Sequence, residues 1–170
     1  MTNHRSSIRF ACAAIAAMLV ALIASCSSVP APAASCGEAV SPADLAGTVW
    51  LLTGYRYGDR FVALDRASMD AAGDGDAFSL SFDGGRVGGV ASCNRYFGEA
   101  AWGGPGGLSI TGLASTKMAC LDEPYGLSEY EFFAALSVAT GWDLANGSLT
   151  LGGRAADGSS VELAFSSPGR

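Results

Sequence analysis

The sequence predicts an α+β fold, in which a curved antiparallel sheet of about seven or eight strands packs against one helix. Two observations predict this fold. Short segments alternate apolar with polar residues between glycine-rich turns, and a single late segment has helical periodicity and capping residues. Strands, one helix and then more strands, with hairpin turns throughout, favour an antiparallel sheet over alternating βαβ units.

The strands before the helix are predicted from their alternation and from the turns between them. Phe78, Leu80 and Phe82 share one face of the second strand, with serines between them. The turns at 83–85 (DGG) and 103–107 (GGPGG) each predict a hairpin. The segments with strand character are 47–56, 77–82, 86–92, 98–102 and 108–114.

The segment between the first two strands, residues 57–77, is predicted to be a long acidic loop. It contains Asp70, Asp74 and Asp76. A calcium site would need more oxygen ligands than these carboxylates offer, and the EF-hand spacing is absent here. We therefore expect a solvated loop, with weak Ca²⁺ binding as the alternative.

Residues 126–141 are predicted to form the helix. Ser128 followed by Glu131 is a capping box, and Gly141 stands where a helix C-terminus favours glycine. One side of the helical wheel collects Leu127, Tyr130, Ala134 and Val138. Neighbouring phenylalanines widen this apolar surface, so we expect the helix to be largely buried against the concave face of the sheet.

Further strands follow the helix and complete the sheet. They are separated by Asn146-Gly147 and by Asp157-Gly158, and both dipeptides are strong hairpin signals. The strand segments here are 141–144, 146–153 and 157–165.

The N-terminus predicts export. His4, Arg5 and Arg9 form a basic region, and residues 10–25 are an apolar run shorter than the roughly 20 residues that a spanning helix needs. The run ends in LIASC, which resembles the lipobox of bacterial lipoproteins, so we predict that Cys26 carries the lipid. An ordinary cleaved signal or an anchoring helix is the alternative.

Three regions are expected along the chain. Residues 1–25 are the lipoprotein signal peptide, 26–43 are a flexible Pro/Ala/Ser tether, and 44–167 are one domain. The expected location is the bacterial cell envelope, where the N-terminal lipid holds the protein to a membrane. That membrane is the outer membrane, facing the periplasm, in a Gram-negative cell, and otherwise the outer face of the cell membrane.

Removal of the signal peptide changes the chemical inventory. The full chain has 10 Lys and Arg against 16 Asp and Glu, and a net charge of −6. Without Arg5 and Arg9 the balance is 8 against 16, or −8. Loss of His4, the only histidine, excludes Ser-His and Cys-His dyads and His-containing metal sites. So acidic a chain is a poor nucleic-acid binder, and the sequence implies no cofactor and no metal.

Several segments of the domain together resemble the META domain, the module of HslJ-like envelope lipoproteins. Their order and spacing cover most of residues 45–165. They are LAGTVWLL at 45–52, FDGGRVGG at 82–89, CNRYFG at 93–98, LASTKMAC at 113–120, EYEFFAAL at 129–136, and the closing SLTL and VELAF at 148–151 and 161–165.

The resemblance implies a cracked or half-open β-barrel with a helix, similar in shape to the pilot lipoproteins of type III secretion. The family is linked to heat response, to resistance against some antibiotics and, in a eukaryotic parasite, to virulence, and no enzymatic activity is established for it. It therefore implies a non-enzymatic, stress-related module that binds a protein partner or an apolar ligand. A thiol-active envelope enzyme or redox protein using Cys93 and Cys120, and a structural spacer, are the alternatives.

Cys93 and Cys120 are predicted to form a disulfide. The resemblance places both at strand ends beside the barrel mouth, and an exported protein meets an oxidising compartment. Such a bridge would stabilise the fold by about 3.5 kcal/mol in the chain-entropy model. Two alternatives remain: a disulfide that involves Cys36, or cysteines that stay as free thiols. Catalysis by Cys93, with Arg95 and Lys117 lowering the pKa of its thiol, lacks a histidine base. A metal site formed by the two cysteines with carboxylates is also disfavoured.

Asn94, Arg95, Tyr96 and Lys117 are the candidate rim or binding residues. One interpretation gives Asn94 a turn cap, places the Tyr96 hydroxyl at the rim and pairs the two cations with carboxylates. The other makes the four residues a polar lip around a cavity or a partner-docking patch. Arginine is commoner than lysine at position 117 in the family, which puts in doubt any role there that needs a planar guanidinium.

Overall fold

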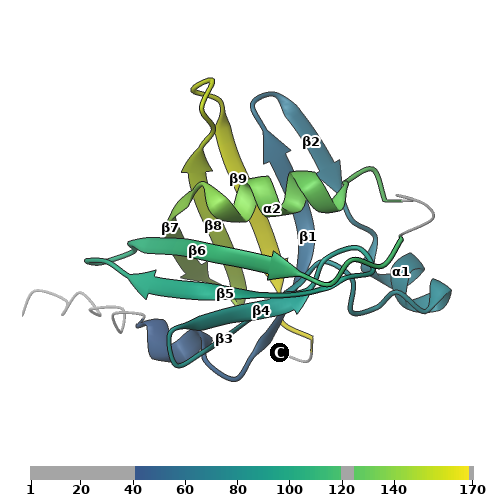
Figure 1. Ribbon diagram of the computed structural model, residues 1–170, viewed down its shortest axis with the longest axis horizontal. Helices are drawn as coiled ribbons and strands as arrows, with labels where there is room; N and C mark the ends of the chain where they lie inside the picture. Colours follow the sequence, from purple (N-terminus) through teal and green to yellow (C-terminus); the bar gives the residue numbers. More distant parts are fainter. Residues whose placement is uncertain (1–40, 120–124, 169–170) are drawn as a thin grey trace, which may run out of the picture. The chain divides into compact units, whose positions relative to one another are not determined.

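The computed structural model describes residues 41–119 and 125–168 (Figure 1). The predicted signal peptide, Cys26 and nearly all of the tether lie outside these residues, and so does Cys120. Among the residues described, no helix is long and apolar enough to cross a bilayer.

One antiparallel sheet forms the body of the domain and curls into a half-barrel, so the predicted α+β fold is confirmed. Its strands follow the order β6-β5-β4-β3-β1-β9-β8-β7, and β2 pairs with β1 beside this row (Figure 1). The bounds are β1 Val49–Tyr57, β2 Arg60–Ala63, β3 Ser79–Asp83, β4 Arg86–Val90, β5 Arg95–Trp102, β6 Leu108–Ser115, β7 Ala139–Ala145, β8 Ser148–Arg154 and β9 Ser160–Ser166.

The described residues hold nine strands, against the seven or eight expected, because the segment 57–77 is not a continuous loop. The turn Gly58-Asp59 leads from β1 into β2, and helix α1 (Arg66–Ala72) follows. Asp65 caps this helix by accepting from the backbone N–H of Ala67 at 3.1 Å, and Gly73 ends it with φ of 88°. The prediction of one long loop was therefore wrong.

Helix α2, Glu129–Ser137, lies within the curl of the sheet and packs against β6 and β9 (Figure 1). The predicted capping box is confirmed, since the Ser128 hydroxyl accepts from the backbone N–H of Glu131 at 3.1 Å and the Glu131 carboxylate accepts from the backbone N–H of Ser128 at 2.9 Å. The predicted C-terminus is wrong. Val138 is the C-cap, and Gly141 already belongs to β7.

The buried face of α2 is narrower than predicted, although Phe132 of the expected apolar surface is buried. Phe132, Ala135 and Leu136 are buried, whereas Tyr130 is 82% exposed. The Phe132 ring anchors this face by packing edge-to-face on Phe78, with ring centroids 5.4 Å apart. Tyr130 and Ala134 are therefore turned away from the core, whereas Leu127 of the same stripe is buried in it.

The curl of the sheet closes where β6 begins. Gly107 forms an isolated antiparallel bridge with Gly141 of β7, and the backbone N–H of Trp142 donates to the Gly106 carbonyl at 2.8 Å. Gly107 has no room for a side chain, because a Cβ there would lie 3.0 Å from the Gly103 Cα. The glycines of the GGPGG turn thus allow the two ends of the sheet to meet.

Replacing Ser128 with alanine is expected to lower the free energy of unfolding by about 1 kcal/mol, because it leaves an orphan donor in the first turn of α2. Urea denaturation of both proteins measures the change. Ser137→Ala is the matched control, since its hydroxyl donates to the Phe133 carbonyl within the helix and its loss should cost less than about 0.5 kcal/mol. Equal losses in the two variants would contradict the capping role.

Candidate functional site

Asn94 is a buried connector, and the expectation that it lines a rim was wrong. Its side chain is 3% exposed at the start of β5. The carboxamide oxygen accepts from the backbone N–H of Met118 at 2.7 Å and from the Thr116 hydroxyl at 2.8 Å. The amide nitrogen donates to the Met118 carbonyl at 3.2 Å and to the Glu129 carboxylate at 3.0 Å. Asn94 thereby joins β5, the segment after β6 and the start of α2.

Tyr96 is a core residue, so its predicted place at the rim was also wrong. The ring is 3% exposed and packs edge-to-face on Phe132 and Phe133, at centroid distances of 5.8 and 5.4 Å. Its hydroxyl donates to the Ser79 carbonyl at 2.9 Å. Burial raises the pKa of Tyr96 well above its ordinary value, so the phenol stays neutral and donating.

Arg95 and Lys117 are exposed, as a rim would require. Arg95 shares a surface hollow of about 430 Å³ with Cys93, whereas Lys117 does not line it. The lining residues are Asp74, Asp76, Val90, Ser92, Cys93, Arg95, Thr116 and Met118. The predicted binding role of Arg95 and Lys117 stays a prediction. So does the Cys93–Cys120 pairing, because Cys120 lies outside the described residues.

The predicted acidic loop places no metal site among the residues that the structure describes. No three His, Cys, Asp or Glu side chains gather there in a geometry that holds a metal ion. Asp74 instead accepts a hydrogen bond from the Tyr125 hydroxyl at 2.5 Å, which ties the region after α1 to the segment before α2.

A larger and more apolar cavity lies beside α2, and we call it the α2 pocket. Its volume is about 460 Å³, within the range of small-molecule sites. Tyrosine, alanine and valine dominate its lining, which consists of Tyr55, Tyr57, Arg60, Tyr130, Glu131, Ala134, Ala135, Val138, Ala155, Ala156 and Val161. The stripe of α2 predicted to face the core, with Tyr130, Ala134 and Val138, therefore lines this pocket instead.

The strand register explains why these side chains converge. Tyr57 lies opposite Arg60 on β2 and opposite Val161 on β9, so all three share one face of the sheet. Arg56 and Phe61 pair on the other face, where the guanidinium carbon lies 4.9 Å from the ring centroid. The pocket exists because the lining positions on α2 and on the β8–β9 connection are mostly alanine, which leaves space above the tyrosines.

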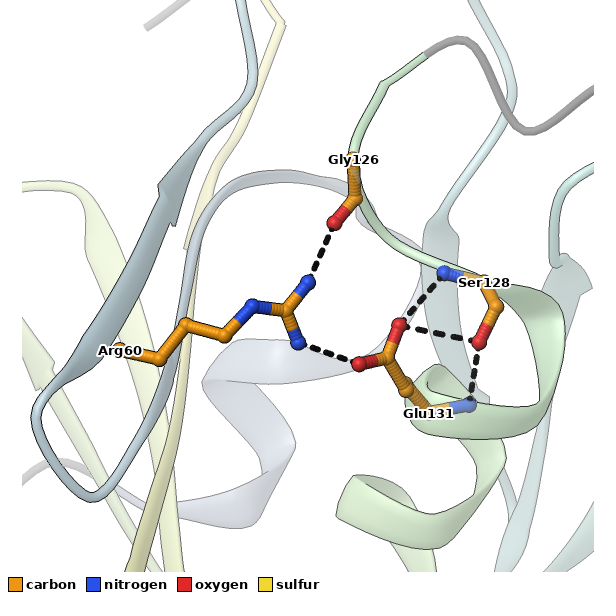
Figure 2. Close-up of polar contacts among 4 residues, drawn as sticks. All are labelled: Arg60, Gly126, Ser128 and Glu131. Atoms are coloured by element: carbon orange, nitrogen blue, oxygen red, sulfur yellow. Dashed lines mark hydrogen bonds and ion pairs between the residues drawn. The ribbon is translucent and has the colours of Figure 1, made fainter.

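An ion pair spans the mouth of the α2 pocket. Arg60 on β2 pairs with the Glu131 carboxylate on α2 and donates to the Gly126 carbonyl at 2.7 Å (Figure 2). The other Glu131 oxygen accepts from the backbone N–H and the hydroxyl of Ser128, at 2.9 and 3.0 Å. Figure 2 shows one carboxylate that both caps α2 and holds the guanidinium of the β1–β2 hairpin.

These contacts set the charge of Glu131. Partial burial opposes ionisation, but the hydrogen bond from the Ser128 backbone and the contacts with Arg60 outweigh it, so the pKa of Glu131 lies below its ordinary value. The network is therefore ionised at neutral pH. Its contribution to stability is present above the unfolded-state pKa and is lost as the pH falls through the lower folded-state pKa.

A second carboxylate lies next to the pocket. Asp157, in the β8–β9 turn, accepts from the backbone N–H of Ser159 and from the Tyr57 hydroxyl, both at 2.8 Å. These hydrogen bonds lower the pKa of Asp157, and the same contact raises the pKa of the Tyr57 phenol. Tyr57 therefore stays neutral at the mouth beside a charged carboxylate.

The sequence did not single out this pocket, although one signal pointed to part of it. Gly58-Asp59, flanked by alternating residues, is a two-residue turn that marks the β1–β2 hairpin, and Gly58 has the positive φ (54°) that such turns need. That hairpin places Arg60 opposite Tyr57. No local signal brings Glu131, more than half the domain away in sequence, to the same guanidinium.

Known proteins that resemble this chain include one sequence family and several solved structures. The model of the META domain family matches residues 43–166. A protein from Burkholderia xenovorans, solved by NMR, has 23% identity and a TM-score of 0.54, covering 82% of this chain and 100% of that one. A DUF4847 family protein from Bacteroides vulgatus has 17% identity and a TM-score of 0.45, covering 71% and 93%. No curated protein matches the chain.

The solved structure from Burkholderia xenovorans shows a shared fold and nothing further, because its identity to this chain is low. The family match spans the whole half-barrel, from before β1 to the last residue of β9. It also includes the segments that carried the resemblance in the sequence. The chain therefore belongs to the META domain family.

Proposed function

We propose that this protein is a non-enzymatic binding module of the bacterial cell envelope, and that it takes an apolar ligand into the α2 pocket. The observation that carries the proposal is the pocket itself, which has about 460 Å³ of space between α2 and the sheet and a mostly aromatic and aliphatic lining. Its walls are set by strand pairing and by the capped helix, so a ligand enters a largely preformed site.

The chemistry of the lining supports binding over catalysis. Arg60 and Glu131 are its charged groups, and they neutralise each other across the mouth. Its tyrosines include Tyr55, which is 3% exposed and whose pKa is raised chiefly by burial. Among the described residues, the lining contains no serine, cysteine, threonine or lysine nucleophile and no histidine base.

The N-terminal residues support a place at the membrane. A signal peptide at 1–25 would direct export, and a lipid on Cys26 would then hold the domain near a bilayer through the short tether. A domain held there meets the apolar molecules that partition into membranes. We propose a stress-related role on the same basis, in which capture of such molecules protects the envelope.

Filling the pocket tests the proposal. Ala134 lines the pocket from the exposed side of α2, so Ala134→Phe adds a ring to the cavity and leaves the core unchanged. We expect the neutral fluorescent probe N-phenyl-1-naphthylamine to bind the wild type, and the variant to bind it about tenfold more weakly or worse. Fluorescence titration measures both affinities.

The matched control is Ser109→Phe, which adds the same ring at an exposed position of β6 that does not line the α2 pocket. It should bind the probe like the wild type. Both variants should keep the melting temperature of the parent within a few degrees. Equal probe binding by wild type and Ala134→Phe would overturn the assignment of the ligand to the α2 pocket.

A further inference from the structure

A carboxylate beside the α2 pocket carries a charge that no ion pair among the described residues neutralises. The guanidinium of Arg60 is already matched by Glu131. Asp157 accepts from the neutral Tyr57 hydroxyl and the Ser159 backbone, and within the described part of the chain no ion pair joins it to a cation. Arg154, on the same turn, donates to the Gly158 carbonyl at 3.0 Å instead. Asp157, which is hydrogen-bonded to a tyrosine of the pocket lining, therefore forms no ion pair among the described residues.

The aromatic rings of the pocket lining favour a positively charged ligand. Tyr57 and Tyr130 line the opening from β1 and from α2, and Tyr130 is 82% exposed, which is unusual for a large aromatic residue. The face of an aromatic ring attracts cations. The wall already makes one such contact, since the guanidinium carbon of Arg60 lies 5.7 Å from the ring centroid of Tyr55.

The net negative charge of the protein also favours a cationic ligand over an anionic one. The chain has a net charge of −6, and without residues 1–25 the charge is −8. A field of this sign repels anions from the pocket and raises the local concentration of cations. An anionic ligand would also have to compete with Glu131 for Arg60, the guanidinium that lines the pocket among the residues described.

We propose that the ligand of the α2 pocket is a cationic amphiphile, an apolar body with an ammonium head group. The apolar body lies against the alanines and valines of α2 and β9. The head group lies at the mouth, near the Asp157 carboxylate and the rings of Tyr57 and Tyr130. This inference rests on the proposed function, because it concerns the ligand of the same pocket.

Three amphiphiles with one chain length and different heads test the head-group preference. Decyltrimethylammonium, decanol and decanoate are each titrated, below the concentrations at which they aggregate, against the protein loaded with N-phenyl-1-naphthylamine. We expect the ammonium compound to displace the probe about tenfold more tightly than the carboxylate, with the alcohol between them. Because the pKa of Asp157 lies below its ordinary value, this preference should persist to mildly acidic pH and fall only as the carboxylate is protonated.

Asp157→Asn locates the preference at the mouth. The asparagine keeps an oxygen for the Tyr57 hydroxyl and removes the charge, so affinity for the ammonium compound should fall about threefold while affinity for the alcohol is unchanged. Asp143→Asn is the matched control. In the described part of the chain this exposed aspartate of β7, unlike Asp157, makes no side-chain hydrogen bond to a residue that lines the pocket, so the variant should keep the head-group preference of the wild type.

The outcomes separate the two proposals. Binding of the carboxylate or the alcohol as tightly as the ammonium compound overturns the cationic head group and leaves apolar binding intact. Equal loss of the preference in both aspartate variants overturns the role of the mouth. Failure of the probe to bind at all overturns the proposed function, and the head-group inference with it.

Discussion

Replacing Asn94 with alanine is expected to lower the free energy of unfolding by about 3 kcal/mol, because it removes a buried carboxamide together with the hydrogen bonds that it makes to three other residues. The carboxamide is 3% exposed and hydrogen-bonds to both backbone groups of Met118 and to the Glu129 carboxylate. Without it, the segment after β6 keeps only part of its attachment to β5, through the hydrogen bonds between Thr116 and the Arg95 backbone. Urea denaturation followed by tryptophan fluorescence measures the loss.

Arg95→Ala is the control for that prediction. Its side chain is exposed on the next residue of the chain, so its removal should change stability by less than about 0.5 kcal/mol. A phenotype in this variant at unchanged stability would support the predicted binding role of Arg95. A loss in Asn94→Ala no larger than in Arg95→Ala would contradict the structural role of Asn94.

Removing the predicted Cys93–Cys120 bridge is expected to lower the free energy of unfolding by about 3.5 kcal/mol, since the unfolded chain regains the entropy of an open loop. The hydrogen bonds between Asn94 and Met118 support this pairing, because they hold together residues one and two positions from the two cysteines. Denaturation of the oxidised protein and of the Cys93→Ser/Cys120→Ser double variant measures the difference.

Cys36→Ser is the control, because it removes the third thiol of the mature chain and leaves the predicted bridge in place. This variant should unfold like the wild type. Alkylation of Cys93 and Cys120 without reductant, mapped by mass spectrometry, would show that no bridge exists. A thiol with a depressed pKa in the same experiment would support the thiol-active alternative.

Local chemistry in the sequence was enough to predict much of the fold. The alternation of Phe78, Leu80 and Phe82 gave the correct buried face, as all three are buried. The turn Asn146-Gly147 joins β7 to β8 as predicted, and both residues have positive φ, 53° and 77°. These predictions succeed because strand alternation and tight turns depend on residues only a few positions apart.

The face of α2 could not be predicted in this way. A helix with apolar residues on most sides fits the core in several rotations, and hydrophobicity alone does not choose among them. The packing of the aromatic side chains fixes the rotation of α2, because the rings of Phe78 and Tyr96 pack edge-to-face on Phe132. Tyr130 was consequently left exposed. The same packing buried Tyr96, although its neighbours Arg95 and Phe97 are exposed.

Local sequence patterns account for most of the strands, for the capped helix α2, for the acidic charge and for the family, but they missed β2 and α1. The position of the α2 pocket depends on the tertiary fold, because β1, β2, α2 and the β8–β9 connection, which build the pocket, are distant in the chain. Its mouth joins Arg60 to Glu131 and Tyr57 to Asp157, over separations of 71 and 100 residues. Contacts over such separations are set by the register of the sheet and the rotation of the helix, and no local pattern encodes either.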